Sequence, residues 1–362
     1  MKSSFGQSVN ISIAGESHGE GLVAILSGLT PGIKIDKEYI SQCLAQRAPR
    51  GKISTPRQEA DEFEILSGVF DGYTTGTPIT ILIRNTNTKS KDYSEMAVTA
   101  RPGHADYTAQ VKYHGFQDYR GGGHFSGRIT AVLVAAGAIA RLALKSKGIE
   151  IGTHVAKCGT VCDRAFENVE EDIALLNSKY FAVLSDESGE KMQAEILKAS
   201  EEGDSIGGIT ETAVCGLPAG LGEPWFDSIE SLISHFMFSI PGVKGVEFGA
   251  GFGVSDMKGS QVNGSLRVEN GRVVPVNDLS GGVNGGITNG DVLKFRCAVR
   301  PTPTIFKEQN TVDMKNLEDK TLSAKGRHDP AIVHRVRAVV DAATALTLCD
   351  VMAQRFGTDW AK

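Results

Sequence analysis

The feature that most constrains the fold is the longest apolar stretch of the chain, residues 129–144. This stretch is rich in alanine, contains Arg141, and is shorter than the roughly 20 residues that a helix needs to span a bilayer. It therefore predicts a helix buried in a protein core. The helical pattern extends over residues 128–147, and residues 331–355 form a second long Ala- and Val-rich helix candidate that starts just after Pro330.

Helices and strands are mixed along the rest of the chain. Residues 36–48 carry buried-type side chains at helical spacing behind an aspartate cap, and residues 189–202 and 229–239 are shorter helix candidates. Runs of β-type residues, several of them alternating apolar with polar, cover 9–14, 78–84, 149–156, 208–215 and 292–299. No repeat or linker divides the chain, although residues 281–286 predict a flexible glycine loop, so we expect one domain over residues 1–362.

Charge and composition favour a small-molecule partner. The net charge of −5 gives no general attraction to nucleic acid or to an anionic membrane, so any anion site must come from local clusters of arginine and lysine.

Residues 1–12 have neither the apolar run of a signal peptide nor the composition of a transit sequence, which predicts a cytoplasmic protein. The six cysteines do not form a disulfide framework and are expected to be reduced and mostly packed. No histidine has clear metal-ligand spacing, and no metal site is predicted.

Two segments each set a histidine among glycines and small polar residues, an arrangement typical of backbone shaped around a ligand: Gly15-Glu16-Ser17-His18-Gly19 and residues 101–108, which read RPGHADYT. Matching stretches lie at 65–70, 119–123, 218–224, 243–247 and 326–330. In this order and at these distances, the segments make almost the whole chain resemble chorismate synthase.

The resemblance implies a fold, a reaction and a cofactor. The fold is an α+β, single-domain β-α-β sandwich with helices packed between two sheets, and the assembly is a homotetramer. The reaction is the 1,4-elimination of phosphate from 5-enolpyruvylshikimate 3-phosphate to give chorismate, the last step of the shikimate pathway to aromatic amino acids. It is redox-neutral, yet it depends on reduced FMN, for which NADPH is a possible reductant.

The resemblance also implies catalytic roles. His18 corresponds to a proton donor near the departing phosphate, and His104 to the histidine that protonates or stabilises the reduced flavin. Asp329 corresponds to an aspartate near the flavin N5 that helps to relay the ring proton, with Ser17 and Ser126 as hydroxyl partners. Three structural alternatives stay open: a loop histidine at 18, capping of a helix near residue 105 by His104 and Asp106, and a helix cap at Asp329.

Several anionic groups must be held, since the substrate bears two carboxylates and a phosphate and FMN adds another phosphate. Arginine suits this task because its planar guanidinium binds phosphate and carboxylate in a bidentate manner. Basic positions that match the substrate region of the family are Arg47, Lys52, Arg128 and Arg335. Positions that match flavin-contacting segments are His124, Phe125, Ser126, Gly285, Arg300, Pro301, Thr302, Pro303, Thr304 and Arg327.

The chain departs from the family after its triple glycine. It reads HFSGRIT over residues 124–130, where most members read RSSARET. We interpret this as a subfamily variant in which Phe125 packs beside the flavin and His124 bonds its phosphate or a nearby loop; the alternative is a repacked helix entrance without ligand contact. Two other functions stay open: a flavin- or phosphate-binding relative without turnover, and the same lyase chemistry on a different phosphorylated substrate.

Overall fold

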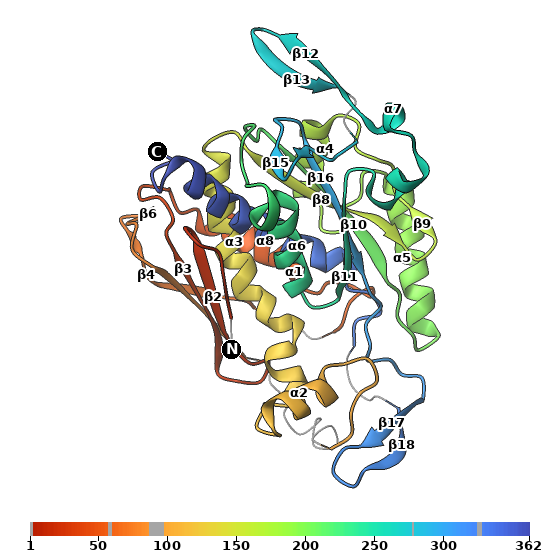
Figure 1. Ribbon diagram of the computed structural model, residues 1–362. Coiled ribbons are helices and arrows are strands. Elements are labelled where there is room, and N and C mark those ends of the chain that lie inside the picture. Colours follow the sequence, from red (N-terminus) through yellow and green to blue (C-terminus); the bar gives the residue numbers. More distant parts are fainter. Residues whose placement is uncertain (1–2, 57–59, 87–97, 277–278, 324–327) are drawn as a thin grey trace.

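Two antiparallel sheets enclose a layer of helices in the computed structural model, which describes residues 3–56, 60–86, 98–276, 279–323 and 328–362 (Figure 1). The first sheet has the order β1-β2-β3-β7-β4, with strands Ser4–Phe5, Asn10–Gly15, Gly21–Ser27, Ile79–Arg84 and Phe63–Ser67. The second has the order β11-β16-β10-β8-β9, with strands Val243–Phe248, Leu293–Val299, Gly208–Cys215, Glu150–Cys158 and Val161–Cys162.

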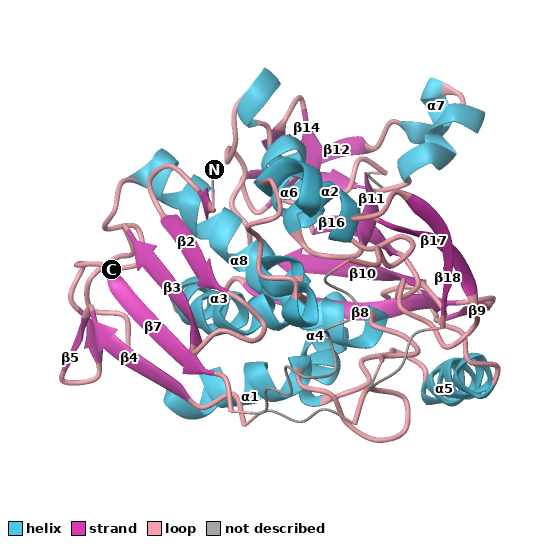
Figure 2. Ribbon diagram, turned by 90° about the horizontal axis from the view of Figure 1, so that it is seen from below, coloured by secondary structure: helices cyan, strands magenta, loops and turns pink. Residues whose placement is uncertain are grey.

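The helices between the sheets are α1, α3, α6 and α8, at Lys37–Arg47, Thr130–Lys145, Ile229–Ser239 and Val333–Phe356 (Figure 2). The other helices are α2, α4, α5 and α7, at Asp106–Tyr113, Val169–Ser178, Asp186–Glu201 and Gly259–Val262. Short 3₁₀ helices η3, η4, η5 and η6 cover Arg120–Phe125, Gly127–Ile129, Trp225–Asp227 and Gly251–Asp256. The predicted α+β sandwich, with helices between two sheets, is confirmed.

Four two-stranded hairpins complete the described part of the chain. They are β5 with β6 at Val69–Phe70 and Tyr73–Thr74, β12 with β13 at Ser265–Glu269 and Arg272–Val276, β14 with β15 at Val283–Asn284 and Ile287–Thr288, and β17 with β18 at Gln309–Asp313 and Glu318–Leu322. The β14–β15 hairpin corrects the prediction of a flexible glycine loop. Gly281 and Gly282 are buried there, at positions where a Cβ would collide with neighbouring backbone, so the glycines serve close packing.

Burial explains why the long apolar segments are helices of the core. Within residues 127–145, 83% of an apolar window long enough to cross a membrane is buried inside the protein, and α8 is buried from Val333 to Ala353 except at Arg335. One continuous cluster of buried side chains joins both sheets to the helix layer. Four of the six cysteines are also buried, as expected, and burial raises the pKa of Cys158 and of Cys297 to about 12.

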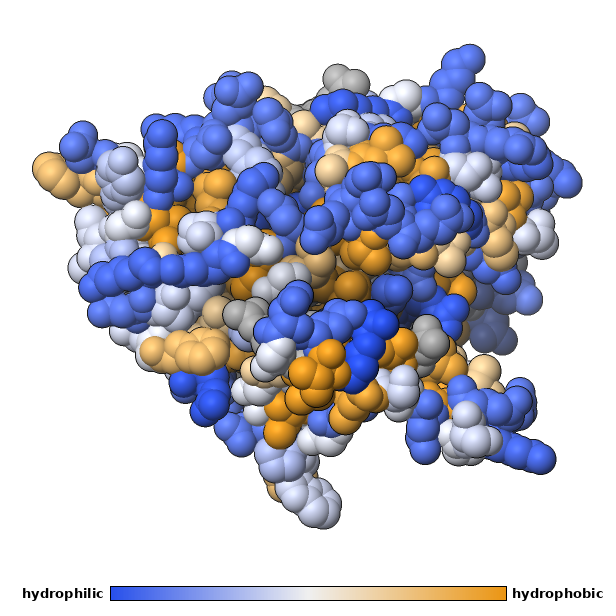
Figure 3. All heavy atoms as spheres, turned by 90° about the horizontal axis from the view of Figure 1, so that it is seen from above, coloured by the Kyte–Doolittle hydropathy of each residue, from blue (hydrophilic) through white to orange (hydrophobic). Residues whose placement is uncertain are grey.

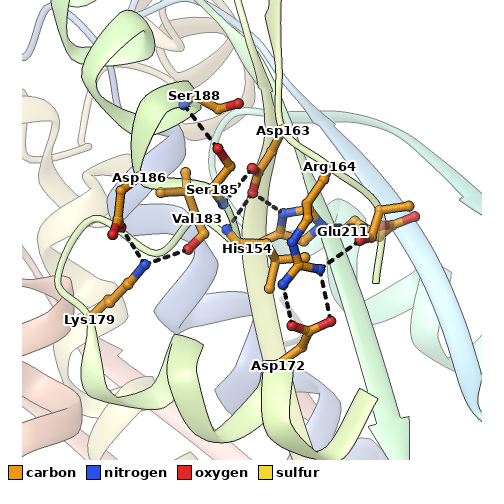
Figure 4. Close-up of polar contacts among 12 residues, drawn as sticks. His154, Asp163, Arg164, Asp172, Lys179, Val183, Ser185, Asp186, Ser188 and Glu211 are labelled. Carbon is orange, nitrogen blue, oxygen red and sulfur yellow. Dashed lines mark hydrogen bonds and ion pairs between the residues drawn. The ribbon is translucent and has the colours of Figure 1, made fainter. Parts of the chain in front are cut away.

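A cluster of charged residues, His154, Asp163 and Glu211, lies on the outer face of the second sheet. Consecutive residues of β8 point to opposite faces, so Thr153 bonds Asp341 of the helix layer at 2.6 Å while His154 points the other way. His154 lies between two carboxylates, with Nδ1 at 2.8 Å from Asp163 and Nε2 at 3.0 Å from Glu211 of β10 (Figure 4). Burial alone would lower the pKa of His154, but the hydrogen bonds to Asp163 and Glu211 raise it above its usual value.

This cluster makes the stability of the fold depend on pH. Because the pKa of His154 is raised in the folded protein, its contribution is fully present below the unfolded value of about 6.5 and is lost as the pH rises through the folded value. We expect His154→Gln to lower the free energy of unfolding by about 1.5–3 kcal/mol at pH 6 and by less at pH 9, measured by urea denaturation. The control is His114→Asn at an exposed turn, and a loss from His154→Gln that is equal at both pH values would contradict the argument.

Candidate active site

A cavity of about 1150 Å³ opens where loops of both sheets meet the first turns of α3 and α8. Typical small-molecule pockets measure about 300–1,000 Å³, so this cavity has room for two ligands side by side. Its lining combines apolar side chains of the first sheet and of the helix layer with basic, acidic and imidazole groups from several loops. The N-terminal ends of α3 and α8 carry partial positive charge, which favours anions at this position.

A turn of three glycines places the two predicted catalytic histidines. A Cβ on Gly121 would lie 2.3 Å from the Cε1 and Nδ1 atoms of His18, and a Cβ on Gly122 would lie 3.1 Å from Cε1 of His104. Both glycines have positive φ angles, of 60° and 86°. Gly123 in turn accepts a hydrogen bond from the Ser17 N–H at 3.1 Å, which ties the His18 loop to the same turn. The two imidazoles therefore pack against one piece of backbone, and side chains at 121 and 122 would displace them.

His104 belongs to a cluster with Arg101 and Asp106. Its Nδ1 lies 3.0 Å from Oδ1 of Asp106, whose two oxygens also accept from the Arg101 guanidinium at 2.7 Å each. Burial acts to raise the pKa of Asp106, but hydrogen bonds from Arg101 and His104 hold it well below its usual range, so the carboxylate stays charged. The capping alternative does not hold, since Ala105 is the N-cap of α2 and no side chain bonds it.

Asp329 lies at the start of α8 without capping it. The N-cap position is Ile332, which has no side-chain hydrogen bond, so the alternative of a helix cap is wrong. Asp329 instead accepts from the Thr55 N–H at 2.9 Å and from Nη1 of Arg335 at 2.7 Å. Arg335 also donates from Nε to the carbonyl of Arg47 at 2.8 Å, which connects the end of α1 to the start of α8.

Two buried arginines of the cavity lining, Arg47 and Arg128, both bond the carboxylate of Asp61, which lies outside the lining. Nη2 of Arg47 lies 2.7 Å from Asp61, and Arg128 bonds the other oxygen of Asp61; the side chains are 5%, 5% and 4% exposed. Burial acts to raise the pKa of Asp61, but Arg47 and Arg128 lower it below its usual value. Nε of Arg47 is buried and has no hydrogen-bond partner among the described residues. An unpaired buried donor is costly, so this nitrogen is suited to meet a ligand.

Asn85 links this pair to the His18 loop. Its side-chain oxygen accepts from Nε of Arg128 at 3.0 Å, and its side-chain nitrogen donates to the carbonyls of Glu16 at 3.0 Å and Gly19 at 2.9 Å. Sequence reasoning missed both Asn85 and Asp61, which are polar residues outside the glycine-rich motifs. Asp61 has a φ of 51°, which is unusual for a residue with a side chain, but that signal exists only in the structure.

The variant segment after the glycines borders the cavity. Nδ1 of His124 donates to the carbonyl of Gly15 at 2.8 Å, and the Phe125 ring meets Tyr113 edge to face at 6.1 Å. Ser126 caps η4 by accepting from the N–H of Arg128 at 3.3 Å. His124, Phe125 and Ser126 all line the cavity, so this segment is positioned for ligand contact.

The remaining predicted residues differ in their position relative to the cavity. Residues 300–304 line the cavity, and Nη1 of Arg300 donates to the carbonyl of Gly103 at 2.9 Å, beside His104. Lys52 and Gly285 are exposed and outside the lining, and Ser17 is buried behind it. Arg327 lies outside the described residues. Within the described part of the chain, no group of three or more His, Cys, Asp or Glu side chains could hold a metal ion.

Alanine substitutions at two nearby glycines, Gly121 and Gly127, test the packing of the glycine turn, because they are expected to change the free energy of unfolding differently. We expect Gly121→Ala to lower the free energy of unfolding by about 2 kcal/mol or more, because the added methyl group overlaps the His18 ring at a positive φ. Gly127→Ala is the matched control, because a Cβ there meets nothing within 4 Å and its φ is not positive. We expect it to be neutral or to stabilise by up to about 1 kcal/mol. Equal losses in urea denaturation would contradict the packing described here.

Comparisons with known proteins identify the family of the chain. The family model described as chorismate synthase matches residues 9–353. Proteins named chorismate synthase are 43% identical in Aeropyrum pernix, over 98% of this chain and 93% of that protein, and 44% identical in Lachnoclostridium phytofermentans, over 97% and 95%. A crystal structure of chorismate synthase superposes with a TM-score of 0.76 at 29% identity, covering 98% of this chain and 94% of that one. The chain therefore belongs to the chorismate synthase family.

Proposed function

We propose that the cavity is where this lyase converts 5-enolpyruvylshikimate 3-phosphate to chorismate and phosphate, with reduced FMN bound beside the substrate. The observation that carries the proposal is the convergence of His18 and His104 on one glycine turn, facing a cavity that Arg47, Arg128 and Arg335 also line. The family supports the reaction, and the geometry supports this location for it.

The lining fits a flavin together with an anionic substrate. The volume of about 1150 Å³ suits two ligands, the apolar side chains suit an aromatic ring system, and the two helix N-termini suit phosphate groups. Nε of Arg47, which has no partner in the part of the chain that the structure describes, supports the presence of a ligand acceptor at this wall. Reduced FMN, when bound, supplies the electron density that lets the allylic phosphate leave. Residues 124–126 and 300–304 are the cavity residues that we assign to holding it.

The two histidines act as acids at different places. His18 is 6% exposed and sits against the glycine turn, which fixes its ring, and we assign it to protonating the departing phosphate. His104 makes no hydrogen bond through Nε2 in the described part of the chain, so this atom is available to the ligand beside it. A positioned acid contributes about 10²–10⁴ in rate, so each histidine is worth several kcal/mol of barrier.

Asp329 and the arginines complete the arrangement. Asp329 is held by Thr55 and Arg335 at the cavity wall, where we assign it to accepting the ring proton, with Ser126 of the same cavity lining as a hydroxyl partner. Arg47, Arg128 and Arg335 hold the carboxylates and the phosphate of the substrate. Their positions are fixed before binding by Asp61, Asn85 and Asp329, which reduces the entropy that binding must offset.

Three further assignments follow the family. We infer that the chain works as one domain, since one continuous core joins both sheets, and that it works in the cytoplasm. We also infer a homotetramer. The exposed apolar residues Leu266, Val268 and Val273 of the β12–β13 hairpin support an interface between copies, and orange patches are visible on the face that carries this hairpin in Figure 3. NADPH stays a candidate reductant of the flavin.

The decisive experiment is anaerobic. Purified protein is mixed with chemically reduced FMN and 5-enolpyruvylshikimate 3-phosphate, and chorismate and free phosphate are followed together, with oxidised FMN as control. We expect equal release of both products with reduced flavin only, and a loss of about 10²-fold or more in His18→Ala. Flavin binding without either product would favour a binding protein without turnover. Turnover of another phosphorylated enol ether in place of this one would change the substrate.

Arg47 and Lys52 allow a matched test of the substrate site. Arg47 lines the cavity while Lys52 is exposed outside it. We expect Arg47→Gln to raise the substrate KM about 10- to 100-fold, since it removes charge-assisted hydrogen bonds of about 1.5–3 kcal/mol, and Lys52→Gln to change it less than about twofold. An equal rise in both variants would place Lys52 at the substrate as well. An unchanged KM in Arg47→Gln would remove Arg47 from the site.

A further inference from the structure

We propose that Asp106 is a positioning residue that keeps a proton on Nδ1 of His104, so that Nε2 is the nitrogen left to exchange a proton in the cavity. The inference rests on the proposed function in one respect, namely that His104 acts on a ligand in the cavity. Its geometric basis is independent of any ligand, because Arg101, His104 and Asp106 form a closed cluster in the protein itself.

The two neighbours of Nδ1 favour opposite forms of the imidazole. Oδ1 of Asp106 and Nη2 of Arg101 each lie 3.0 Å from Nδ1. A guanidinium can only donate, so Arg101 bonds Nδ1 only when that nitrogen carries a lone pair and the proton sits on Nε2. A carboxylate can only accept, so Asp106 bonds Nδ1 only when that nitrogen carries the proton. The neighbour that prevails decides whether Nε2, the nitrogen on the cavity side, carries a lone pair or a proton in the neutral ring.

The geometry favours Asp106. Nη2 of Arg101 already has a charged acceptor in Oδ1 of Asp106 at 2.7 Å, and Nε of Arg101 bonds Oδ2 at the same distance. A guanidinium bond to a carboxylate is stronger than one to a neutral imidazole, so Arg101 gains little by turning to Nδ1. The backbone N–H of Arg101 also donates to Oδ2 at 2.9 Å, which holds the carboxylate in place. Among the described residues, Oδ1 of Asp106 is the one acceptor that bonds the proton on Nδ1.

The same cluster explains what Arg101 does. It holds Asp106 ionised and fixed, but it cannot itself keep the proton on Nδ1. If the carboxylate were lost, Nη2 would be free to donate to Nδ1 and would favour the form with the proton on Nε2. That form has no proton on Nδ1, so release of the Nε2 proton would leave an imidazolate anion. A ring that keeps its Nδ1 proton can instead gain and release a proton at Nε2 while it changes only between imidazolium and neutral imidazole. Asp106 therefore sets the direction in which His104 exchanges its proton.

The test reads the imidazole directly. The full-length protein is labelled with ¹⁵N at histidine and studied by magic-angle-spinning NMR at pH 9, where the two neutral forms give different pairs of ¹⁵N shifts, and His104→Gln assigns the signal. We expect wild-type His104 to carry its proton on Nδ1, and Asp106→Asn to move it wholly or partly to Nε2. We expect kcat of Asp106→Asn to fall at least tenfold, with the substrate KM changed less than about threefold.

A matched control is Asp172→Asn. Asp172 also accepts from two guanidinium nitrogens, those of Arg164, and from a backbone N–H, that of Glu167, but it lies in the outer layer beyond the second sheet. We expect Asp172→Asn to leave both the His104 signal and kcat unchanged.

Two results would overturn the proposal: a proton on Nε2 of His104 in the wild-type protein, or an Asp106→Asn variant that keeps the proton on Nδ1 and the wild-type kcat. The wild-type spectrum is decisive even if the variant does not fold. Wild-type turnover in His104→Gln would instead refute the proposed role of His104, whatever its form.

Discussion

The close approach of α3 and α8 is the constraint on which the rest of the structure depends. A Cβ on Gly137 of α3 would lie 2.3 Å from the Cβ of Ala342 on α8, so only glycine permits this helix spacing. Because the two helices touch along their small residues, the two sheets can close over them with one continuous core. The same contact brings the first turns of both helices to one cavity. The contact between Gly137 and Ala342 in the middle of the helix layer therefore fixes where the cavity forms.

Two buried aspartates of α8, Asp341 and Asp350, have polar partners in other parts of the fold. Asp341 of α8 lies 3.4 Å from Nη1 of Arg141 on α3 and 3.6 Å from Nη1 of Arg337, and it accepts from Thr153 of the second sheet. At the other end of α8, Asp350 accepts from the N–H groups of residues 7, 8 and 9, at distances of 2.7–3.0 Å, just before β2 begins. Each aspartate thus joins α8 to one of the two sheets. Since a buried charge without a partner is costly, these contacts select this arrangement of layers over others.

Residue periodicity and capping residues were enough to predict the helices and strands whose whole pattern lies within one short segment. The helix predicted over 36–48 forms as α1 with Asp36 accepting from the N–H of Tyr39, and the five predicted strands all form as β2, β7, β8, β10 and β16. In the two large sheets, the strands β1, β3, β4, β9 and β11 were not predicted, and neither was the helix α4. β3 is a short apolar run, which periodicity alone cannot separate from a buried helix. In the site, the motifs supplied His18, His104 and Asp329, but the partners Asp61 and Asn85 are brought to the arginines only by folding.

These partners also reduce the net charge of the group formed by Arg47, Arg128 and Arg335. Arg47, Arg128 and Arg335 bring three positive charges, and Asp61 and Asp329 return two negative ones, so the group keeps one net charge. A stronger field would attract many anions to a protein whose overall charge is −5, but it would also leave buried guanidiniums unpaired without ligand. With the aspartates in place, the donors that remain for a ligand include Nε of Arg47, which has no hydrogen-bond partner among the described residues, the lining side chains Lys244 and Arg300, and the two helix N-termini. These donors have fixed directions, so the site selects anions by the position of their oxygens more than by their charge.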